Sequence, residues 1–401
     1  MLLALIFWTS VLLLAYVYAG YPLLIHLWSR LRPKHSIEGD IHPRVSILVV
    51  AHNEAHQLVA RLENLLTLEY PLDRIDVLVG SDGSNDGTDA LSLRFRHPRL
   101  RIFNFPTRRG KAAVLNDLVA AAHGEILVMA DTRQRFAADA VEKLVRHFAD
   151  PTVGAVSGEL VLTPNAKGTA VGEGVGFYWR YEKLIRSSES LTDSTVGATG
   201  AIYAIRRELF DPLPEDIILD DVLAPVRIMA RGYRVLFEPR ARAYDRAAGS
   251  AAEEFTRKVR TITGNFQLLC RETWLLSPLR NRLWFQTLSH KGLRLTGPVL
   301  LAGAFGANLG LLHSPFYHLP LIAQVLFYLA ALGGFLLRDA RKRIRPLIVP
   351  YTVCLLNWAT AVAFFRFVTQ PQGAIWEGAA PVSLVAASRV VGDRSVTRRS
   401  A

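Results

Sequence analysis

Residues 75–88, IDVLVGSDGSNDGT, contain the pattern that decides the fold, because a short, mostly apolar run ends there in a loop rich in glycine, aspartate and serine. Similar apolar runs recur at VSILVV (45–50), RIFNF (101–105) and EILVMA (125–130). Helical patterns separate these runs at 54–67, 88–95 and 111–122. Strands that alternate with helices predict an α/β fold with a mainly parallel, doubly wound sheet.

Polar and acidic side chains follow these predicted strands. Asn53 and Glu54 come after the first strand, Asp82 lies in the loop after the second, and Asp131 follows the fourth. Because ligands of doubly wound sheets bind at the carboxyl ends of the strands, we expect these side chains to line one site. Each acid also has a structural alternative, which is turn chemistry for Asp82 and a helix N-cap for Asp131. A Gly-x-Gly-x-x-Gly fingerprint and a Walker loop are absent, which argues against dinucleotide and P-loop sites.

A third acidic position is the doublet Asp220-Asp221, in EDIILDDVLAPVRIMARGYRV (215–235). The helical spacing of Asp221, Ala224 and Ile228 places the doublet near the start of a helix that packs on its apolar side. The doublet is therefore either a third functional position or a solvated acidic helix start, which is favourable in any helix.

The composition indicates that apolar and polar residues are segregated along the chain. Of 401 residues, 50% are hydrophobic and 20% are charged, the formal net charge is +12, and the mean hydropathy is +0.20. These values exclude disorder and a collagen-like chain, and the presence of Cys270 and Cys354 alone excludes a disulfide framework. The positive charge suits nucleic acid, anionic lipid or a phosphorylated substrate.

The first apolar segment, residues 1–29, has no charged side chain and exceeds the about 20 residues that span a bilayer core. It predicts a transmembrane helix. A cleaved signal peptide is the alternative, although it would have a basic start and a shorter apolar stretch. Because Arg30, Arg32 and Lys34 follow the span, the positive-inside rule places the N-terminus outside and the next residues in the cytoplasm.

C-terminal transmembrane helices are predicted within 292–370, from uncharged runs at 295–312, 316–337 and 346–365. A buried helical hairpin is the alternative. The link RDARKRIR (338–345) is basic, in agreement with a cytoplasmic side. The last run contains Pro350 and Asn357, so it is either a span or a re-entrant segment, and the side of the tail (371–401) stays open.

The polar block between the apolar ends, residues 40–273, is long enough to bury a core of its own and predicts one cytoplasmic domain. Residues 274–291 mix Trp, Leu and Phe with Arg and His, which is typical of an amphipathic helix on a membrane surface. Together these segments predict a multi-pass protein of the inner (cell) membrane that contacts membrane lipid.

The ordered motifs are HNE (52–54), SDGSNDGT (81–88), RRGKAAVLN (108–116), the strand-ending Asp131, GATGAIYAIRR (197–207), the acidic doublet and RKVR (257–260). This set resembles the family-2 glycosyltransferases, whose GT-A fold is a doubly wound, Rossmann-like domain. The membrane-embedded branch is the most similar, with the synthases of cellulose, hyaluronan and poly-N-acetylglucosamine and ceramide glucosyltransferase. The resemblance covers about residues 44–266, and the flanking apolar segments also fit it.

The resemblance implies a nucleotide-diphosphate sugar as donor, most often UDP-linked. Asp82, with Asn53 and Glu54, would hold the nucleobase and ribose, because carboxylates accept their N–H and O–H groups. Lys111 would bind the diphosphate at a helix start, with an ordinary surface lysine as the alternative. Asp131 would bind Mg²⁺ or Mn²⁺, which bridges the diphosphate and offsets the charge of the leaving group.

The resemblance also assigns the acceptor side. Asp221 would be the general base, with Asp220 at the Glu position of the family's Thr-Glu-Asp motif. One base opposite a diphosphate leaving group implies a single displacement with inversion. Gly200 would let the acceptor approach the backbone closely. Arg257 and Arg260 would neutralise the diphosphate, with binding of anionic lipid as the alternative.

Two motifs depart from the family pattern. The usual Asp-x-Asp is Asp131-Thr132-Arg133, so a cation replaces one potential metal ligand. The metal is then held by Asp131 and substrate oxygens, or Arg133 supplies part of the charge. The Gln-x-x-Arg-Trp motif of processive synthases keeps Arg260 but has Thr261 in place of tryptophan, which removes the aromatic platform for a growing chain.

The sequence therefore predicts an inverting glycosyltransferase that acts on a polysaccharide or other glycan acceptor, as in exopolysaccharide synthesis. Transfer of one sugar to a membrane lipid is the alternative, and the missing tryptophan favours it. A non-catalytic protein that binds nucleotide sugar is a further alternative, but it would not need all three acidic positions. Nucleic acid is not expected as a partner, because many basic residues flank membrane spans or belong to the diphosphate site. The oligomeric state is left open.

Overall fold

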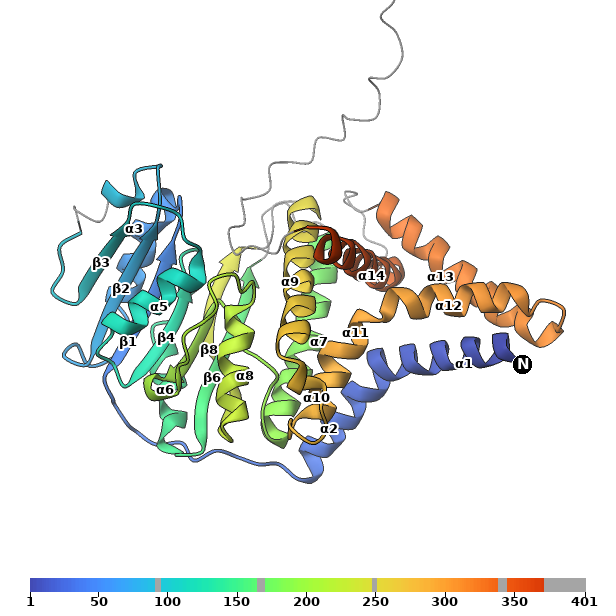
Figure 1. Cartoon of the computed structure of the whole chain (residues 1–401), viewed down its shortest axis with the longest axis horizontal. Coiled ribbons are helices and arrows are strands. Elements are labelled where there is room, and N and C mark those ends of the chain that lie inside the picture. The colour runs from blue at the N-terminus through green and yellow to red at the C-terminus, as the bar shows by residue number, and fades with distance from the viewer. Residues whose placement is uncertain (91–94, 164–169, 247–250, 338–344, 371–401) are drawn as a thin grey trace, which may run out of the picture.

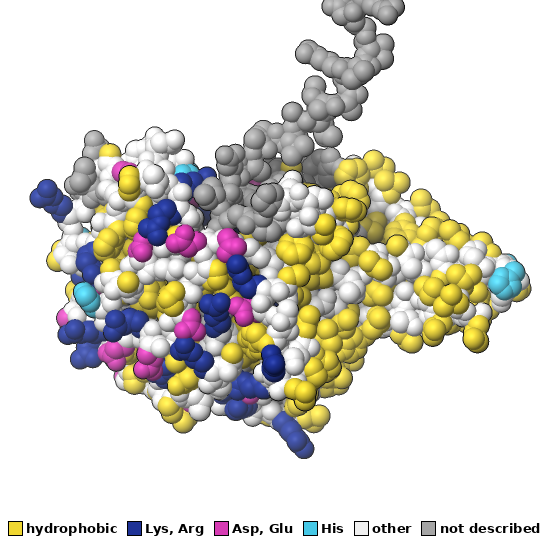
Figure 2. All heavy atoms as spheres, viewed as in Figure 1, with side chains coloured by type: hydrophobic (Ala, Val, Ile, Leu, Met, Phe, Trp, Pro, Cys, Tyr) yellow, Lys and Arg dark blue, Asp and Glu magenta, His cyan; other side chains and the backbone are white. Residues whose placement is uncertain are grey.

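The computed structural model describes residues 1–90, 95–163, 170–246, 251–337 and 345–370. A domain built on a β-sheet lies at one end of the molecule, and apolar helices extend from it at the other (Figure 1). Figure 2 shows the same division in side chains, since charged groups gather over the sheet domain and hydrophobic ones over the protruding helices.

Eight strands form one sheet, in the order β3-β2-β1-β4-β7-β6-β8-β5. The predicted strands are β1 (Val45–Ala51), β2 (Ile75–Asp82), β3 (Leu100–Phe105) and β4 (Ile126–Asp131). These four run parallel to one another. The expected doubly wound, parallel arrangement is thus confirmed for this half of the sheet.

The other half of the sheet is mixed and was not predicted. Its strands are β5 (Arg135–Phe136), β6 (Val153–Thr163), β7 (Ile202–Arg206) and β8 (Arg234–Arg246). β7 runs antiparallel to both β4 and β6, while β6 and β8 are parallel. The reversed β7 places Tyr203 opposite Met129 of β4 and Ser157 of β6. The GATGAIY segment therefore reaches the edge of the sheet where Asp131 lies.

Helices cover both faces of the sheet and complete two buried cores. On one face are α3 (Ala55–Leu66) and α6 (Ala140–Val145), and on the other are α5 (Lys111–Ala121) and α8 (Asp220–Ala230). The predicted helices at 54–67 and 111–122 are confirmed as α3 and α5. Part of the predicted helix at 88–95 lies outside the described residues.

Among the described residues, three helical segments are long and apolar enough to cross a membrane: Leu2–Leu31, Pro315–Leu336 and Pro346–Thr369. The first comprises α1 (Leu2–Ala15), a π-helical turn (Tyr16–Gly20) and α2 (Tyr21–Leu31). A shorter apolar helix is α12 (Gly297–Gly310), which packs along α1, and α13 (His318–Leu336) packs on α14 (Arg345–Thr369). Two long helices of the sheet domain face this bundle, α7 (Ala170–Thr192) against α2 and α9 (Ala251–Arg271) against α14.

The prediction of one amphipathic helix at 274–291 is wrong. The segment instead forms a 3-10 turn (Thr273–Leu276), a short helix α10 (Trp284–Gln286) and a π-helical turn (Thr287–Gly292), which leads into α11 (Leu293–Leu295). Pro278 follows the first turn and cannot continue a helix. Asn281 then fixes the break, because its side chain donates to the carbonyl of Leu275 at 2.8 Å. His290 is buried between the carboxylates of Glu182 and Glu189, at 2.7 and 2.8 Å, so part of the segment packs into the protein.

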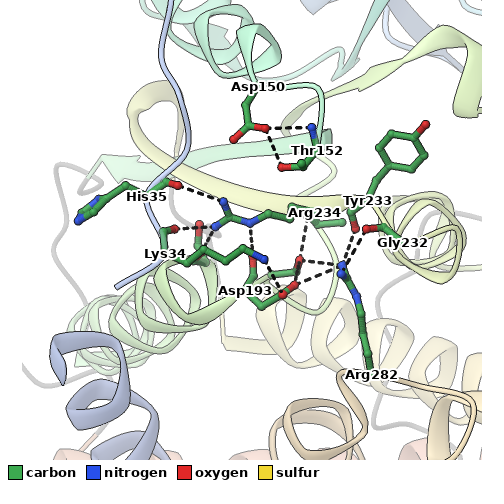
Figure 3. Close-up of polar contacts among 12 residues, drawn as sticks. Lys34, His35, Asp150, Thr152, Asp193, Gly232, Tyr233, Arg234 and Arg282 are labelled. Carbon is green, nitrogen blue, oxygen red and sulfur yellow. Dashed lines mark hydrogen bonds and ion pairs between the residues drawn. The ribbon is translucent and has the colours of Figure 1, made fainter. Parts of the chain in front are cut away.

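A buried arginine fixes the link between the N-terminal helix and the sheet. The guanidinium of Arg234, on β8, donates to the carbonyls of Lys34, Asp193 and Ser190 at 2.7, 2.9 and 3.1 Å (Figure 3). Arg234 is only 2% exposed. The carboxylate of Asp193 lies 3.2 Å from Arg282, which follows the 3-10 turn (Figure 3). The linker between α2 and β1 (residues 32–44), the end of α7 and the 274–291 segment thus share one polar cluster.

Candidate active site

The loops that follow β1 and β2 are joined by hydrogen bonds. Asn53 has a positive φ of 54°, and its side-chain oxygen accepts the N–H of Asn85 at 2.9 Å. The N–H of Glu54 donates to the hydroxyl of Thr88 at 3.1 Å. Burial raises the pKa of the Glu54 carboxyl, whereas the charge of Arg133 lowers it. The two predicted loops therefore form one polar surface at the sheet edge, and the role of Asn53 and Glu54 in binding a nucleoside stays a prediction.

Asp82 holds the turn that precedes α5. Its carboxylate is 3% exposed and accepts the backbone N–H groups of Arg109 at 2.6 Å and Gly110 at 2.9 Å. Gly83 must be glycine here, because its φ is +59° and a Cβ would lie 2.4 Å from the backbone nitrogen of Arg108. Asp82 thus shapes the RRGK turn, and its contact with a nucleobase stays a prediction.

Lys111 brings two of the predicted acids together. Its ammonium lies 3.0 Å from a carboxylate oxygen of Asp131 and 3.1 Å from one of Asp220. Burial would lower the pKa of this ammonium, but the charges of Asp131, Asp220 and Asp221 raise the pKa above its usual range. The start of α5, the end of β4 and the start of α8 therefore meet at a single charged cluster.

Asp221 is oriented by the glycine-containing segment before β7. The N–H of Gly200 donates to its carboxylate at 2.7 Å, and a Cβ on Gly200 would lie 3.1 Å from the same oxygen. Burial and the charge of Asp220 raise the pKa of Asp221, the charge of Lys111 opposes the rise, and the resulting pKa is about 6. A carboxyl with a pKa of about 6 is ionised at neutral pH and still basic enough to take a proton.

Tyr203 belongs to this site and was not predicted. Its side chain is fully buried, and within the described part of the chain its hydroxyl has no hydrogen-bond partner. Burial and the charges of Asp220, Asp221 and Asp131 hold the pKa of the phenol well above its usual range. The only signal in the sequence is a tyrosine on an otherwise aliphatic strand directly after the GATG motif.

Arg133, which replaces the second metal-binding acid, turns toward β8. Its guanidinium lies 3.8 Å from the carboxylate of Asp245, to which the side chain of Gln134 also donates at 2.9 Å. Arg133 is therefore held beside the cluster by a partner of its own.

The two predicted arginines of α9 do not join the cluster. Arg257 forms an ion pair with Glu253 of its own helix. In the described parts of the chain, neither Arg257 nor Arg260 forms a hydrogen bond or an ion pair with the acids around Lys111. The neighbouring Val259 is buried against Ala359 and Ala363 of α14. The contact of Arg257 and Arg260 with a diphosphate stays a prediction.

The same helix supports the acidic doublet from behind, which the sequence did not indicate. The side chain of Gln267 accepts the N–H of Ile218 at 2.9 Å and donates to the carbonyl of Asp216 at 2.8 Å. Gly264 lets the two segments touch, because a Cβ there would lie 2.5 Å from Leu219. α9 therefore fixes the loop from which Asp220 and Asp221 start.

The residues around Lys111 fit a divalent cation in part. The carboxylates of Asp131 and Asp220 converge on one position of positive charge, and oxygen ligands suit Mg²⁺ and Mn²⁺. Because Lys111 holds that position, a cation there needs the ammonium to move and needs further oxygens from the substrate.

A second group, Glu38, His147 and Glu238, has its ligand atoms within 4.8 Å of one another. Arginines already neutralise both of its acids, since Arg240 contacts Glu38 at 2.9 Å and Glu238 at 2.6 Å, and Arg146 contacts Glu38 at 3.0 Å. His147 itself lies 2.7 Å from Glu238. We interpret this group as an ion-pair cluster that anchors the linker to the sheet.

Several known proteins share this sequence and fold. Residues 46–213 match the family model described as glycosyl transferase family 2. The chain is 26% identical over 208 residues to the beta-monoglucosyldiacylglycerol synthase of Synechocystis sp., which is 48% of this chain and 42% of that one. It is 24% identical over 250 residues to the poly-beta-1,6-N-acetyl-D-glucosamine synthase of Staphylococcus aureus, or 60% and 59% of the two chains. The chain thus spans about half the length of the curated relatives it matches.

A solved structure extends the similarity to nearly the whole chain. Mannosyltransferase PcManGT from Pyrobaculum calidifontis, in complex with GDP-Man and Mn²⁺, matches with a TM-score of 0.69 and 25% identity, over 91% of this chain and 99% of that one. Fold and site therefore define the class of protein, a glycosyltransferase of the GT-A fold. Within that class the chain carries a glycosyltransferase family 2 domain, as its motifs predicted.

Proposed function

We propose that the chain is an inverting glycosyltransferase that moves a sugar from a nucleotide-diphosphate sugar to an acceptor held at the membrane. One observation carries this proposal. Asp221 is a partly buried carboxylate with a pKa of about 6, oriented by the N–H of Gly200, and it lies beside the charged cluster of Lys111, Asp131 and Asp220. A base and a site for a diphosphate leaving group are thereby adjacent.

On the donor side, the start of α5 and the ammonium of Lys111 would bind the diphosphate, because helix N-termini and cations both attract phosphate. Asp131 would hold Mg²⁺ or Mn²⁺, which when bound offsets negative charge on the leaving diphosphate. Asp82, Asn53 and Glu54 would bind the nucleoside at the loops after β1 and β2. A UDP-sugar is the predicted donor, and a GDP-sugar is the alternative because PcManGT was solved with GDP-Man.

On the acceptor side, the acceptor hydroxyl would attack the anomeric carbon while Asp221 takes its proton. The new bond from oxygen to carbon forms as the bond from carbon to the phosphate oxygen breaks, and the nucleoside diphosphate leaves with the electron pair. A single displacement of this kind inverts the anomeric centre. Asp220 would hold Lys111 beside the site until the donor binds, and Arg257 and Arg260 would add positive charge at the entrance to the site.

The acceptor would reach this site from the membrane. The loop that carries the acidic doublet rests on α9, and α9 packs against α14 through Val259, Ala359 and Ala363. Two observations favour a membrane lipid over the glycan expected from the motif order. The described residues contain three long apolar helices and a short one, and Thr261 offers an exposed hydroxyl where a processive synthase would have tryptophan. We place the sheet domain on the cytoplasmic side of the inner membrane.

The test is a transfer assay with membrane vesicles and a panel of radiolabelled UDP- and GDP-sugars. A product that extracts into organic solvent and carries one sugar supports a lipid acceptor, whereas a large water-soluble product supports a glycan. Asp221→Asn should abolish transfer. Asp211→Asn, which removes an acid paired with Arg231 away from the cluster, should not. Absence of transfer with every donor by the unmodified chain would overturn the proposal, and full activity of Asp221→Asn would remove that residue as the base.

A further inference from the structure

The ammonium of Lys111 occupies the position between two carboxylates that a divalent cation would occupy. It contacts Asp131, at the end of β4, and Asp220, at the start of α8. Asp220 is 7% exposed, and within the described residues its Oδ2 atom has no hydrogen-bond partner. Its contact with Lys111 is therefore an ion pair alone, without the geometry of a hydrogen bond.

Tyr203 is a second residue beside this cluster with a buried oxygen that lacks a hydrogen bond. Its hydroxyl is also buried and, in the part of the chain that the structure describes, also lacks a partner. Buried polar groups are nearly always hydrogen-bonded, so two buried oxygen atoms without a hydrogen bond beside the same cluster require an explanation. A second arrangement of the cluster, reached when ligands bind, would provide one.

The charges around Lys111 explain why its contacts with Asp131 and Asp220 must change when a donor and a divalent cation bind. Asp131, Asp220 and Asp221 carry three negative charges, and Lys111 is the cation among them. The α5 start, where the proposed diphosphate would lie, is formed by the same lysine. A divalent cation between Asp131 and Asp220 would take the position of this ammonium, so Lys111 must give up these contacts when such a cation binds, and its ammonium is then available to the diphosphate.

We propose that Lys111 fills the cation position in the donor-free chain and moves to the diphosphate when donor and divalent cation bind together. The inference rests on the proposed function, because it takes the diphosphate as the ligand. It adds an order to binding: the metal binds weakly without nucleotide, and each ligand strengthens the other by the same factor.

The test is Mn²⁺ binding to the full chain in lipid nanodiscs, measured by electron paramagnetic resonance without any sugar transfer. Lys111→Met keeps a stem of similar length but removes the charge, so this variant should bind Mn²⁺ at least about tenfold more tightly than the unmodified chain when no nucleotide is present. Lys111→Arg should keep the weak binding. Lys143→Met is the matched control, since that lysine pairs with Asp139 at the start of α6, and it should change the affinity at most about threefold.

Addition of saturating UDP or GDP should strengthen Mn²⁺ binding in the unmodified chain more than in Lys111→Met. Three outcomes would overturn the proposal: unchanged or weaker Mn²⁺ binding by Lys111→Met, an equal gain in Lys143→Met, or equal Mn²⁺ affinity of the unmodified chain with and without either nucleotide. The last measurement uses the unmodified chain alone, so it does not depend on whether a variant folds. The transfer assay stands apart from these measurements, so a chain that shows the exchange but transfers no sugar would refute the proposed function alone.

Discussion

Replacement of Asp221 with asparagine should abolish sugar transfer and, at neutral pH, make the protein more stable. Burial, together with the charge of Asp220, raises the pKa of Asp221 from its ordinary 3.8 to about 6. Folding therefore disfavours the ionised carboxylate. The N–H of Gly200 donates to the carboxylate of Asp221 at 2.7 Å in the unmodified chain. The amide of asparagine removes the charge and still offers an oxygen to this N–H.

The size of the effect follows from the two pKa values. Above about pH 6 the carboxylate is ionised in both the folded and the unfolded chain, and its burial costs about 3 kcal/mol of folding free energy. As the pH falls from 6 to 4, the folded chain binds the proton first and this cost decreases. Below the unfolded value both states are protonated and the cost is gone. The gain in Asp221→Asn should therefore be large at pH 7.5 and small at pH 4.5.

The assay is thermal unfolding of the detergent-solubilised chain, followed by tryptophan fluorescence at both pH values. For domains of this size each kcal/mol shifts Tm by about 2–4 °C, so Asp221→Asn should unfold several degrees higher at pH 7.5. Asp86→Asn is the control of opposite sign. Although burial raises the pKa of Asp86, hydrogen bonds from Thr88 and Ala55 lower it, and their loss should destabilise the fold. A Tm of Asp221→Asn at or below that of the unmodified chain at pH 7.5 would refute the reasoning, as would an equal gain at both pH values.

Four further predictions follow from the site and the linker. Transfer by the unmodified chain should decline as the pH falls through about 6, because Asp221 becomes protonated; a flat profile of kcat/KM between pH 5 and 8 would contradict this. Gly200→Ala should lower kcat about tenfold with little change in donor KM, because the new Cβ displaces the carboxylate of Asp221; a raised KM with unchanged kcat would argue for a donor contact instead. Tyr203→Phe should stabilise the donor-free chain by up to about 1 kcal/mol in urea unfolding, because it removes a buried hydroxyl that has no partner among the described residues; a loss of stability would show that the hydroxyl is bonded. In the same urea experiment, Arg234→Met should lower the free energy of unfolding by about 3 kcal/mol or more, because its guanidinium is buried. Replacement of the partly exposed Arg282 with methionine should lower it by less than about 1 kcal/mol, and equal losses would contradict the role of the buried guanidinium.

The first half of the sheet was predictable because its information is local. Each of β1 to β4 is a short apolar run that ends in a polar loop, and α3 shows its buried face at helical spacing. The placement of Asp82 and Asp131 followed from one rule, that parallel strands bring their carboxyl ends to the same edge. The sequence thus predicted the sheet edge at which these two acids lie better than it predicted what each side chain contacts.

The contacts themselves depend on pairings between distant segments. Gly200 reaches Asp221 because β7 reverses direction between β4 and β6, and sequence periodicity does not reveal the direction of a strand. Lys111 was predicted to bind a diphosphate. In the structure its ammonium pairs with Asp131 of β4 and Asp220 of α8, because a long, flexible cation pairs with the nearest uncompensated acids. The composition of 274–291 suggests one helix, but Pro278, whose ring cannot continue a helix, breaks it.

The clearest case is α9, whose basic RKVR motif suggested substrate binding, although Arg257 and Lys258 pair with acids of their own helix. The structure gives the helix a second role through its small and amide side chains: Gln267 and Gly264 hold the loop before Asp220, and Val259 packs on α14. The Cβ distance at Gly264 leaves no free space between α9 and Leu219, so a shift of α9 must also shift that loop. The helix that contacts the apolar bundle is therefore the same one that fixes the position of the acidic doublet. An acceptor held beside α14 would therefore lie next to the helix that positions Asp221, and this connection is the physical reason to expect a membrane-held acceptor.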